Sequence, residues 1–314
     1  MQPSAVFKSR HAVIDVGTNS VKLLVAEVTD FEVLPVFEAS EQTRLGRGLY
    51  STGRMADESM AATAAAVHRY AGVARKMGAV RLRVIATSAA REATNAHELV
   101  QILNDASGVE LEIISGDQEA RWAFSGVTSQ AGLGGIPILV LDVGGGSTEF
   151  VLGEDQTILF QQSFPMGSVR LFETVAPGDH PGAAGWDRCR SWLWDYLGRE
   201  VAPVLGPALA KLFPRRVIGV GGTTAILALI RHEQEQFDRE LIESTALTTD
   251  HLRSMVQELW TLPLAERQRI PGLPPERADV ILTGSAIYEA IMEYFNFEDL
   301  RISTRGLRHA AVRE

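Results

Sequence analysis

The chain has 314 residues, 46% apolar and 22% charged, and its formal net charge is -9 at pH 7. That length accommodates two domains, and that composition excludes an intrinsically disordered chain. The acidic balance predicts no basic surface for duplex nucleic acid. The single cysteine, Cys189, excludes both an internal disulfide and a cysteine-based zinc site.

No apolar run approaches the length of a membrane span. The longest, residues 136–141, contains Pro137, and near the N-terminus Asp15 interrupts the sequence before a signal-like apolar core develops. A lone cysteine also suits a reducing compartment. We therefore expect a cytoplasmic protein without a membrane segment.

An internal repeat is the most informative feature of the chain. Residues 13–20 read VIDVGTNS and residues 140–147 read VLDVGGGS, at a constant offset, 142 − 15 = 127. In each copy a β-branched run reaches an aspartate, a glycine turn follows and a second apolar run begins, which is typical of a β-hairpin. Two such hairpins predict two related domains.

Helical and strand patterns alternate after the first hairpin. Residues 57–77 have helical spacing and precede the stop signal Gly78. A strand is expected over 82–86, a helix over 95–105 and a strand over 111–115. A further helix begins at 116–121, with Asp117 as its expected N-cap and Glu119 in its first turn.

The domain boundary is expected where glycines cluster, at 126–135. We assign residues 1–126 to domain I and 127–314 to domain II. Domain II is expected to contain the second hairpin, a helix around 186–197, a strand-turn-helix unit at 217–225 and helices after Asp250 and Ala278, the last interrupted at 283–285. A strand and a short helix over 301–308 end the pattern, and that helix is expected to pack on domain I. Sheets covered by helices indicate the α/β class.

Three glycine turns have the chemistry of anion-binding loops. The first, at 15–22, gathers backbone N–H groups, polar side chains and the positive charge of Lys22. The second, at 142–149, has three consecutive glycines, so a ligand can approach its backbone closely. The third, at 219–224, joins a strand to a helix and either binds an anion or simply permits close packing.

Asp15 and Asp142 occupy equivalent ends of the two repeats. If the two domains pack symmetrically, both carboxylates face one cleft and hold hydrated Mg²⁺ beside phosphates. Capping of its own turn is the usual role of a lone aspartate in this setting. Two copies in register favour the functional interpretation.

Glu119 is the candidate general base for attack by water on a terminal phosphorus, with capping of its helix as the alternative role. Arg91 could neutralise charge in the transition state, and Arg44 and Arg47 could grip phosphates, unless these arginines are ordinary surface charges. The histidines lack metal-ligand spacing, and neither G-x-S-x-G nor H-E-x-x-H occurs. Triad hydrolases and zinc proteases are therefore disfavoured.

The ordered motifs resemble the Ppx/GppA family of exopolyphosphatases and guanosine pentaphosphate phosphohydrolases, in its short two-domain form. The segments that carry the resemblance are IDVGTNSVKLLV (14–25), TRLGRGL (43–49), ATSAAREATN (86–95), ISGDQEARWAFSGV (114–127), LDVGGGSTEF (141–150), FPMGSVRL (164–171), VIGVGGTTA (217–225), PGLPPERADVILTGSAI (271–287) and STRGLRHA (303–310).

This resemblance implies two ribonuclease H-like domains of the actin, hexokinase and heat-shock type that flank a central cleft. It implies catalytic roles for Glu119, Arg91 and Glu149, and metal ligation by Asp142, Asp15 and Glu149. It places phosphate-binding roles on Thr18, Asn19, Ser20, Lys22, Arg44, Gly145, Gly146, Ser147, Gly222 and Thr223. Mg²⁺ is the implied cofactor, K⁺ is a candidate monovalent cation, and family analogy points to a homodimer.

Our leading hypothesis is that the protein releases orthophosphate from the ends of inorganic polyphosphate. Hydrolysis of guanosine pentaphosphate would use the same catalytic residues with a different outer pocket. A small-molecule kinase of the same fold would need adenosine and acceptor pockets, which the sequence does not single out. An actin-like polymer or nucleotide-sensing scaffold is the non-enzymatic alternative.

Overall fold

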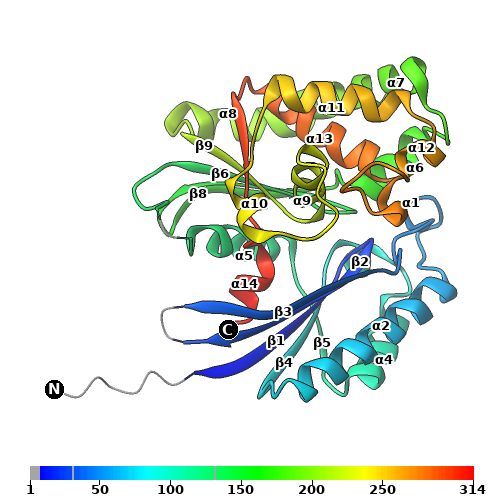
Figure 1. The fold of residues 1–314 in the computed structure, drawn as a ribbon, viewed down its shortest axis with the longest axis vertical. Helices are drawn as coiled ribbons and strands as arrows, with labels where there is room; N and C mark the ends of the chain where they lie inside the picture. The colour runs from blue at the N-terminus through cyan, green and yellow to red at the C-terminus, as the bar shows by residue number, and fades with distance from the viewer. Residues whose placement is uncertain (1–7, 30–31, 131) are drawn as a thin grey trace. The chain divides into compact units, whose positions relative to one another are not determined.

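The computed structural model describes residues 8–29, 32–130 and 132–314, which divide into two compact units. Unit 1 comprises the described residues up to Ser129 together with Leu307–Glu314, and unit 2 comprises Gln130–Gly306. Each unit is a sheet carrying helices (Figure 1). Within the described ranges, no helix combines the length and the apolar character needed to cross a bilayer.

Unit 1 contains a five-stranded sheet in the order β3-β2-β1-β4-β5. Its first three strands form an antiparallel meander, and the last two run parallel to β1. The strands are β1 (Ser9–Val16), β2 (Ser20–Val28), β3 (Val33–Gln42), β4 (Arg81–Ala86) and β5 (Leu111–Ile113). The helices are α1 (Leu49–Thr52), α2 (Asp57–Lys76), α3 (Ser88–Glu92), α4 (Ala96–Ser107), α5 (Gly116–Thr128) and α14 (Leu307–Ala311).

Alternating side chains of β1 and β2 supply two separate cores, because successive residues of a strand point to opposite faces. Ile14 and Leu23 pack with residues of α2 and α4. Val13 and Leu24 pack with Trp122 of α5 and with residues of α14. Helices therefore cover both faces of this sheet, and the terminal segment belongs to the second core.

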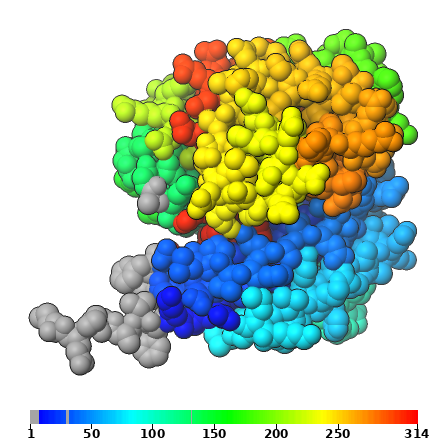
Figure 2. Space-filling view, in the orientation of Figure 1, coloured from blue at the N-terminus to red at the C-terminus, as the bar shows by residue number. Residues whose placement is uncertain are grey.

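Unit 2 contains a six-stranded sheet in the order β10-β11-β9-β6-β7-β8. The strands are β6 (Ile138–Val143), β7 (Thr148–Glu154), β8 (Thr157–Phe164), β9 (Arg216–Val220), β10 (Ala246–Thr248) and β11 (Asp299–Ile302). The helices are α6 (Ser168–Val175), α7 (Gly182–Tyr196), α8 (Ala202–Lys211), α9 (Gly222–Arg231), α10 (Arg239–Ser244), α11 (Thr249–Thr261), α12 (Leu264–Arg267) and α13 (Ile281–Tyr294), with a π-helical turn at Leu197–Val201 and a 3₁₀ turn at Pro275–Arg277. In the space-filling view the yellow segment that includes α10 lies at the surface of this unit (Figure 2).

The repeat seen in the sequence is a repeat of topology. The order β3-β2-β1-β4-β5 of unit 1 returns as β8-β7-β6-β9-β11 in unit 2, with β10 added at the edge. In both units an antiparallel meander is followed by parallel strands. Both predicted hairpins are confirmed, and the α/β class is confirmed.

Two predicted helix details are wrong. The N-cap of α5 is Ser115, whose side chain accepts a hydrogen bond from Gln118 N, and Asp117 lies inside the first turn. Helix α13 runs unbroken through residues 283–285. There the Thr283 and Ser285 hydroxyls donate to backbone carbonyls of the preceding turn, so these polar residues do not interrupt the helix.

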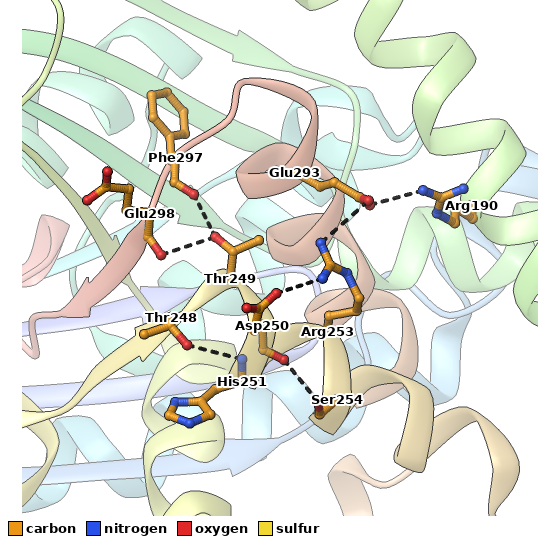
Figure 3. Close-up of polar contacts among 10 residues, drawn as sticks. All are labelled: Arg190, Thr248, Thr249, Asp250, His251, Arg253, Ser254, Glu293, Phe297 and Glu298. Atoms are coloured by element: carbon orange, nitrogen blue, oxygen red, sulfur yellow. Dashed lines mark hydrogen bonds and ion pairs between the residues drawn. The ribbon is translucent and has the colours of Figure 1, made fainter.

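Helix α13 is buried along nearly its whole length. At its C-terminal end Glu293 accepts a hydrogen bond from Arg190 of α7 at 3.1 Å and lies 3.6 Å from Arg253 of α11 (Figure 3). Arg253 also donates to Asp250 at 2.7 Å. These contacts fix α13 between its neighbours, and its other end lies against the loops described next.

Candidate active site

The first hairpin turn is closed by a hydrogen bond from Gly17 N to Ser20 O at 3.0 Å. Asp15 on β1 lies directly opposite Lys22 on β2, so both side chains lie on one face of the sheet. Burial raises the pKa of the Asp15 carboxyl, and the positive charges of Lys22 and Arg308 oppose that rise. The turn thus carries an aspartate whose charge is compensated within its own unit.

The loop at 43–47 braces this turn. Thr43 N and Arg44 N donate to Asn19 O, and Gly46 N donates to Thr18 O at 2.7 Å. A side-chain carbon at Gly46 would come within 2.2 Å of Thr18 Cγ2, so only glycine fits there. Arg44 has a φ of 51°, an unusual conformation for a residue with a side chain and one that often marks a functional loop.

The predicted phosphate-binding residues Thr18, Asn19 and Ser20 are all buried in this turn. Asn19 donates from its side chain to Gln42 Oε1 at 2.9 Å. Thr18 Oγ1 is buried and has no hydrogen-bond partner among the residues that the structure describes. Because a buried hydroxyl without a partner costs about 1–3 kcal/mol, this oxygen is a natural contact for a ligand.

Arg91 and Glu119, which the sequence singles out separately, form an ion pair in unit 1. Arg91 Nη1 donates to Glu119 Oε2 at 2.7 Å and to Ile114 O at 3.0 Å. Arg91 lies in the last turn of the short helix α3, and Glu119 lies in the first turn of α5 with only 6% of its surface exposed. The pair gives this unit a nearly buried carboxylate in a fixed orientation.

The second hairpin repeats the first turn with different chemistry. Gly144 N donates to Ser147 O at 2.9 Å, the equivalent of the bond in unit 1. Asp142 on β6 lies directly opposite Glu149 on β7, so two carboxylates share one face. Glu149 Oε1 accepts hydrogen bonds from Ser147 at 2.7 Å and from Ser163 of β8 at 2.6 Å.

The glycine carbonyls of this turn are held by the start of α6. Ser168 N donates to Gly144 O, Val169 N and Arg170 N donate to Gly145 O, and Arg170 Nε donates to Gly146 O. A side-chain carbon at Gly167 would come within 2.5 Å of the backbone of Gly145 and Gly146. The turn is therefore rigid, and its carbonyl oxygens are directed toward α6.

The third glycine turn lies beside the second hairpin. A side-chain carbon at Gly221, whose φ is 94°, would come within 2.9 Å of Asp142 Oδ1. One at Gly222 would come within 3.1 Å of the guanidinium of Arg277. The start of α9, at Gly222 and the buried Thr223, therefore lies close to both a carboxylate and a buried cation.

Each unit by itself brings its predicted residues together. Unit 1 holds Asp15, Lys22 and the turn 18–20 with its bracing loop, and it also holds the Arg91–Glu119 pair. Unit 2 holds Asp142, Glu149, the turn 145–147 and Gly222 with Thr223. The predicted meeting of Asp15 with Asp142 stays a prediction.

The donor set suits a hard cation held jointly by protein and substrate. Among the described residues, no group of three or more histidine, cysteine, aspartate or glutamate side chains could hold a metal ion. Asp142 and Glu149 form a pair of oxygen donors, and Mg²⁺ is usually bound by one or two carboxylates together with phosphate oxygens and water.

Ser163, Arg277 and Tyr288 adjoin the site but were not predicted from the sequence. Ser163 donates to Glu149, Arg277 lies against Gly222, and the Tyr288 hydroxyl contacts the backbone on both sides of Asp142. Arg277 lies inside the motif at 271–287 and Tyr288 follows it directly, so the charged and glycine residues of that motif were the available signal. No sequence motif marks Ser163, because only the pairing of β7 with β8 brings it next to Glu149.

Solved structures show the fold that these units form. A Ppx/GppA enzyme from Aquifex aeolicus is 28% identical with a TM-score of 0.79, over 98% of this chain and 99% of that one. An exopolyphosphatase from Cytophaga hutchinsonii is 26% identical with a TM-score of 0.86, over 96% of each chain. The two units accordingly form an actin-like α/β fold of the hexokinase and heat-shock type, and the enzyme class is that of phosphoanhydride hydrolases.

The family is also shown by sequence. The model of the Ppx/GppA phosphatase family matches residues 24–313. Exopolyphosphatase 2 of Mycobacterium tuberculosis is 33% identical over 295 residues, which cover 90% of each chain. The chain belongs to the Ppx/GppA phosphatase family.

Proposed function

We propose that this protein is an exopolyphosphatase that releases orthophosphate from the ends of inorganic polyphosphate. The observation that carries the proposal is the Arg91–Glu119 pair, in which a nearly buried carboxylate contacts a partly exposed guanidinium at 2.7 Å in the unit that also holds the first anion turn. Hydrolysis needs a group that accepts a proton from water and a cation near the transferred phosphoryl group. The names of the similar mycobacterial and Cytophaga proteins support the choice of substrate.

In this mechanism Glu119 orients water and accepts its proton as the water oxygen attacks the terminal phosphorus. The phosphoanhydride bond to the bridging oxygen breaks, so that orthophosphate forms and the shortened polyphosphate leaves with that oxygen. Arg91 holds the Glu119 carboxylate in place and would share the negative charge of the phosphoryl group. The turns at 18–20 and 145–147 and the start of α9 bind phosphate oxygens, with Lys22, Arg44 and Arg277 as nearby cations.

Asp142 and Glu149 would hold Mg²⁺. When bound, Mg²⁺ supplies neutralisation of phosphate charge. Ser147 and Ser163 direct the Glu149 carboxylate, since both hydroxyls donate to its Oε1.

Phosphate release from polyphosphates of graded length, measured across a Mg²⁺ series, tests this function. Glu119→Gln is expected to lower kcat by about 10³-fold, the usual scale of a lost general base, with KM little changed. Glu112→Gln is the matched control, because it breaks another arginine–glutamate pair of unit 1, with Arg83. Wild-type turnover in Glu119→Gln would remove Glu119 from the mechanism.

The same assay with guanosine pentaphosphate separates the two substrates expected of the family. Faster release from the nucleotide than from every polyphosphate length would reassign the substrate and leave the catalytic residues in place. ATP-dependent phosphorylation of a small acceptor at a higher rate than phosphate release would instead replace hydrolysis by a kinase activity.

A further inference from the structure

Tyr288 lies where the ladder between two strands of unit 2 ends. The parallel pairing of β6 with β9 stops at Asp142 and Val220. At this point the Tyr288 hydroxyl lies 2.9 Å from Val220 O and 3.2 Å from Leu141 O, the two carbonyls that share its proton. The same oxygen accepts a hydrogen bond from Val143 N at 3.3 Å.

These contacts enclose the proposed metal ligand. Leu141 and Val143 are the residues on either side of Asp142, and Val220 immediately precedes the turn at 221–223. One side chain therefore connects the backbone around the carboxylate with the backbone that leads into the third anion turn. The ladder ends by pairing Asp142 with Val220, and the Tyr288 hydroxyl adds the link just beyond that pair, where Asp142 Oδ1 lies against Gly221.

The ring of Tyr288 is fixed as firmly as its hydroxyl. Tyr288 has no exposed surface, and a side-chain carbon at Gly219 would come within 3.1 Å of its Cε1. Glycine inside a strand often marks such a close approach, and at Gly219 the same carbon would come still closer, 2.6 Å, to Thr224 Cγ2. Burial and the negative charge of Asp142 raise the pKa of Tyr288, so the hydroxyl keeps its proton at neutral pH.

The rest of α13 holds the same loops at other points. Thr283 Oγ1 donates to Ser168 O at 2.6 Å, and Ser168 in turn binds Gly144 O. A side-chain carbon at Gly284 would come within 2.9 Å of Thr223 Oγ1. Both glycine turns of unit 2 are thus attached to one buried helix, and Tyr288 is its contact nearest to Asp142.

We infer that Tyr288 is a positioning residue. Through its contacts with the backbone it fixes the position of Asp142 relative to the turn at 221–223. This inference rests on the proposed function, because it assigns to Tyr288 the placement of the proposed metal ligand. A small displacement of such a group costs far more in turnover than in folding, since catalysis depends on geometry.

Tyr288→Phe tests the inference, because it keeps the ring and removes only the hydroxyl. Hydrogen exchange followed by mass spectrometry is expected to show about tenfold faster exchange at residues 143–147 and 221–224, with the first hairpin of unit 1 unchanged. With polyphosphate as substrate, kcat is expected to fall about tenfold and the Mg²⁺ concentration for half-activation to rise, with KM little altered. Tyr294→Phe, a second tyrosine of α13, is the matched control and is expected to change neither measurement.

The outcomes separate this inference from the proposed function. Absence of phosphate release by the wild-type protein would defeat the proposed function, whereas local exchange would still report on Tyr288. Uniformly faster exchange with unchanged kcat and Mg²⁺ dependence would make Tyr288 a stabilising core residue and overturn the inference. If Tyr288→Phe does not fold, Thr224→Val is expected to give the same local loss of protection, because the Thr224 hydroxyl donates to Gly221 O and its methyl group lies with Tyr288 against Gly219. Unchanged protection in Thr224→Val would then overturn the inference.

Discussion

The two hairpins have the same turn but opposite charge pairing. In unit 1 Asp15 lies across from Lys22, and in unit 2, at the same offset, Asp142 lies across from Glu149. Both turns are closed by equivalent hydrogen bonds, and both are braced by the segment that follows the third strand of the meander. The backbone pairing is the same in both hairpins, but a lysine stands in unit 1 where a glutamate stands in unit 2.

This difference in charge pairing indicates that the two hairpins have different roles in binding. An opposite pair across two strands is stabilising, whereas two carboxylates directly opposite each other repel. The first hairpin therefore carries its own cation and suits direct binding of phosphate. The second hairpin has two facing carboxylates and no lysine at the equivalent position, and this makes it the stronger candidate for the proposed metal.

Neutralising one aspartate at a time gives the largest expected effect. Asp142→Asn is expected to lower kcat by about 10³-fold. It is also expected to abolish the rise in Tm that Mg²⁺ should give the wild-type protein, since a ligand at 100 times its Kd stabilises by about 2.7 kcal/mol. Asp15→Asn should lower kcat less and keep most of that rise. Phosphate release and thermal unfolding with and without Mg²⁺ measure both. Equal loss of the Mg²⁺-induced rise in Tm in the two variants would contradict the assignment of the metal to the second hairpin.

Glu289 is a third buried carboxylate that can be compared with Asp15 and Asp142. Unlike Asp15 it has no lysine opposite it, and unlike both it is not part of the candidate active site. Burial, and then the charge of Glu293, raise the pKa of Glu289 to about 7, against the opposing effects of Arg190 and Arg253. Its carboxyl is 1% exposed and packs in the region of Cys189. The folded protein therefore binds a proton here that the unfolded chain has released.

The sign of the resulting pH dependence follows from that proton. Between pH 4.5 and 7 the folded state holds more protons, so stability falls as pH rises through this window, by about 3 kcal/mol in total for this group. Glu289→Gln should remove this slope and raise stability at pH 8, as measured by urea unfolding at pH 5 and pH 8. Glu258→Gln, an exposed change on α11, is the control. A slope that survives in Glu289→Gln would assign the pH dependence to other groups.

The duplicated hairpin could be predicted from the sequence, because its turn requires glycine and aspartate at fixed positions. A requirement of this local kind can be recognised in the sequence without knowledge of the fold. The sequence also places Glu119 in the first turn of α5, where an N-cap precedes an apolar run. The Arg91–Glu119 contact could not be predicted from spacing, because it depends on how α3 and α5 pack. Ser163 and Tyr288 were missed for the same reason, since strand pairing and a buried helix bring them to the site.

Replacing the cation of the first hairpin gives the smallest effect and the sharpest comparison. Lys22→Met keeps the length of the side chain and removes its charge, so polyphosphate is expected to bind less tightly. KM should rise about tenfold, which corresponds to about 1.4 kcal/mol, with kcat nearly unchanged, because charge on a bound phosphate chain is neutralised equally before and during reaction. KM measured over a series of polyphosphate lengths, at low and at high ionic strength, tests this expectation. The ratio of variant to wild-type KM should fall at high salt, because salt screens the attraction that Lys22 provides in the wild-type protein.

Lys76→Met, a change in the last turn of α2, controls for lost charge elsewhere in unit 1. A fall in kcat at constant KM would show instead that Lys22 acts on the transition state, and the first hairpin would then share the chemistry assigned to the second.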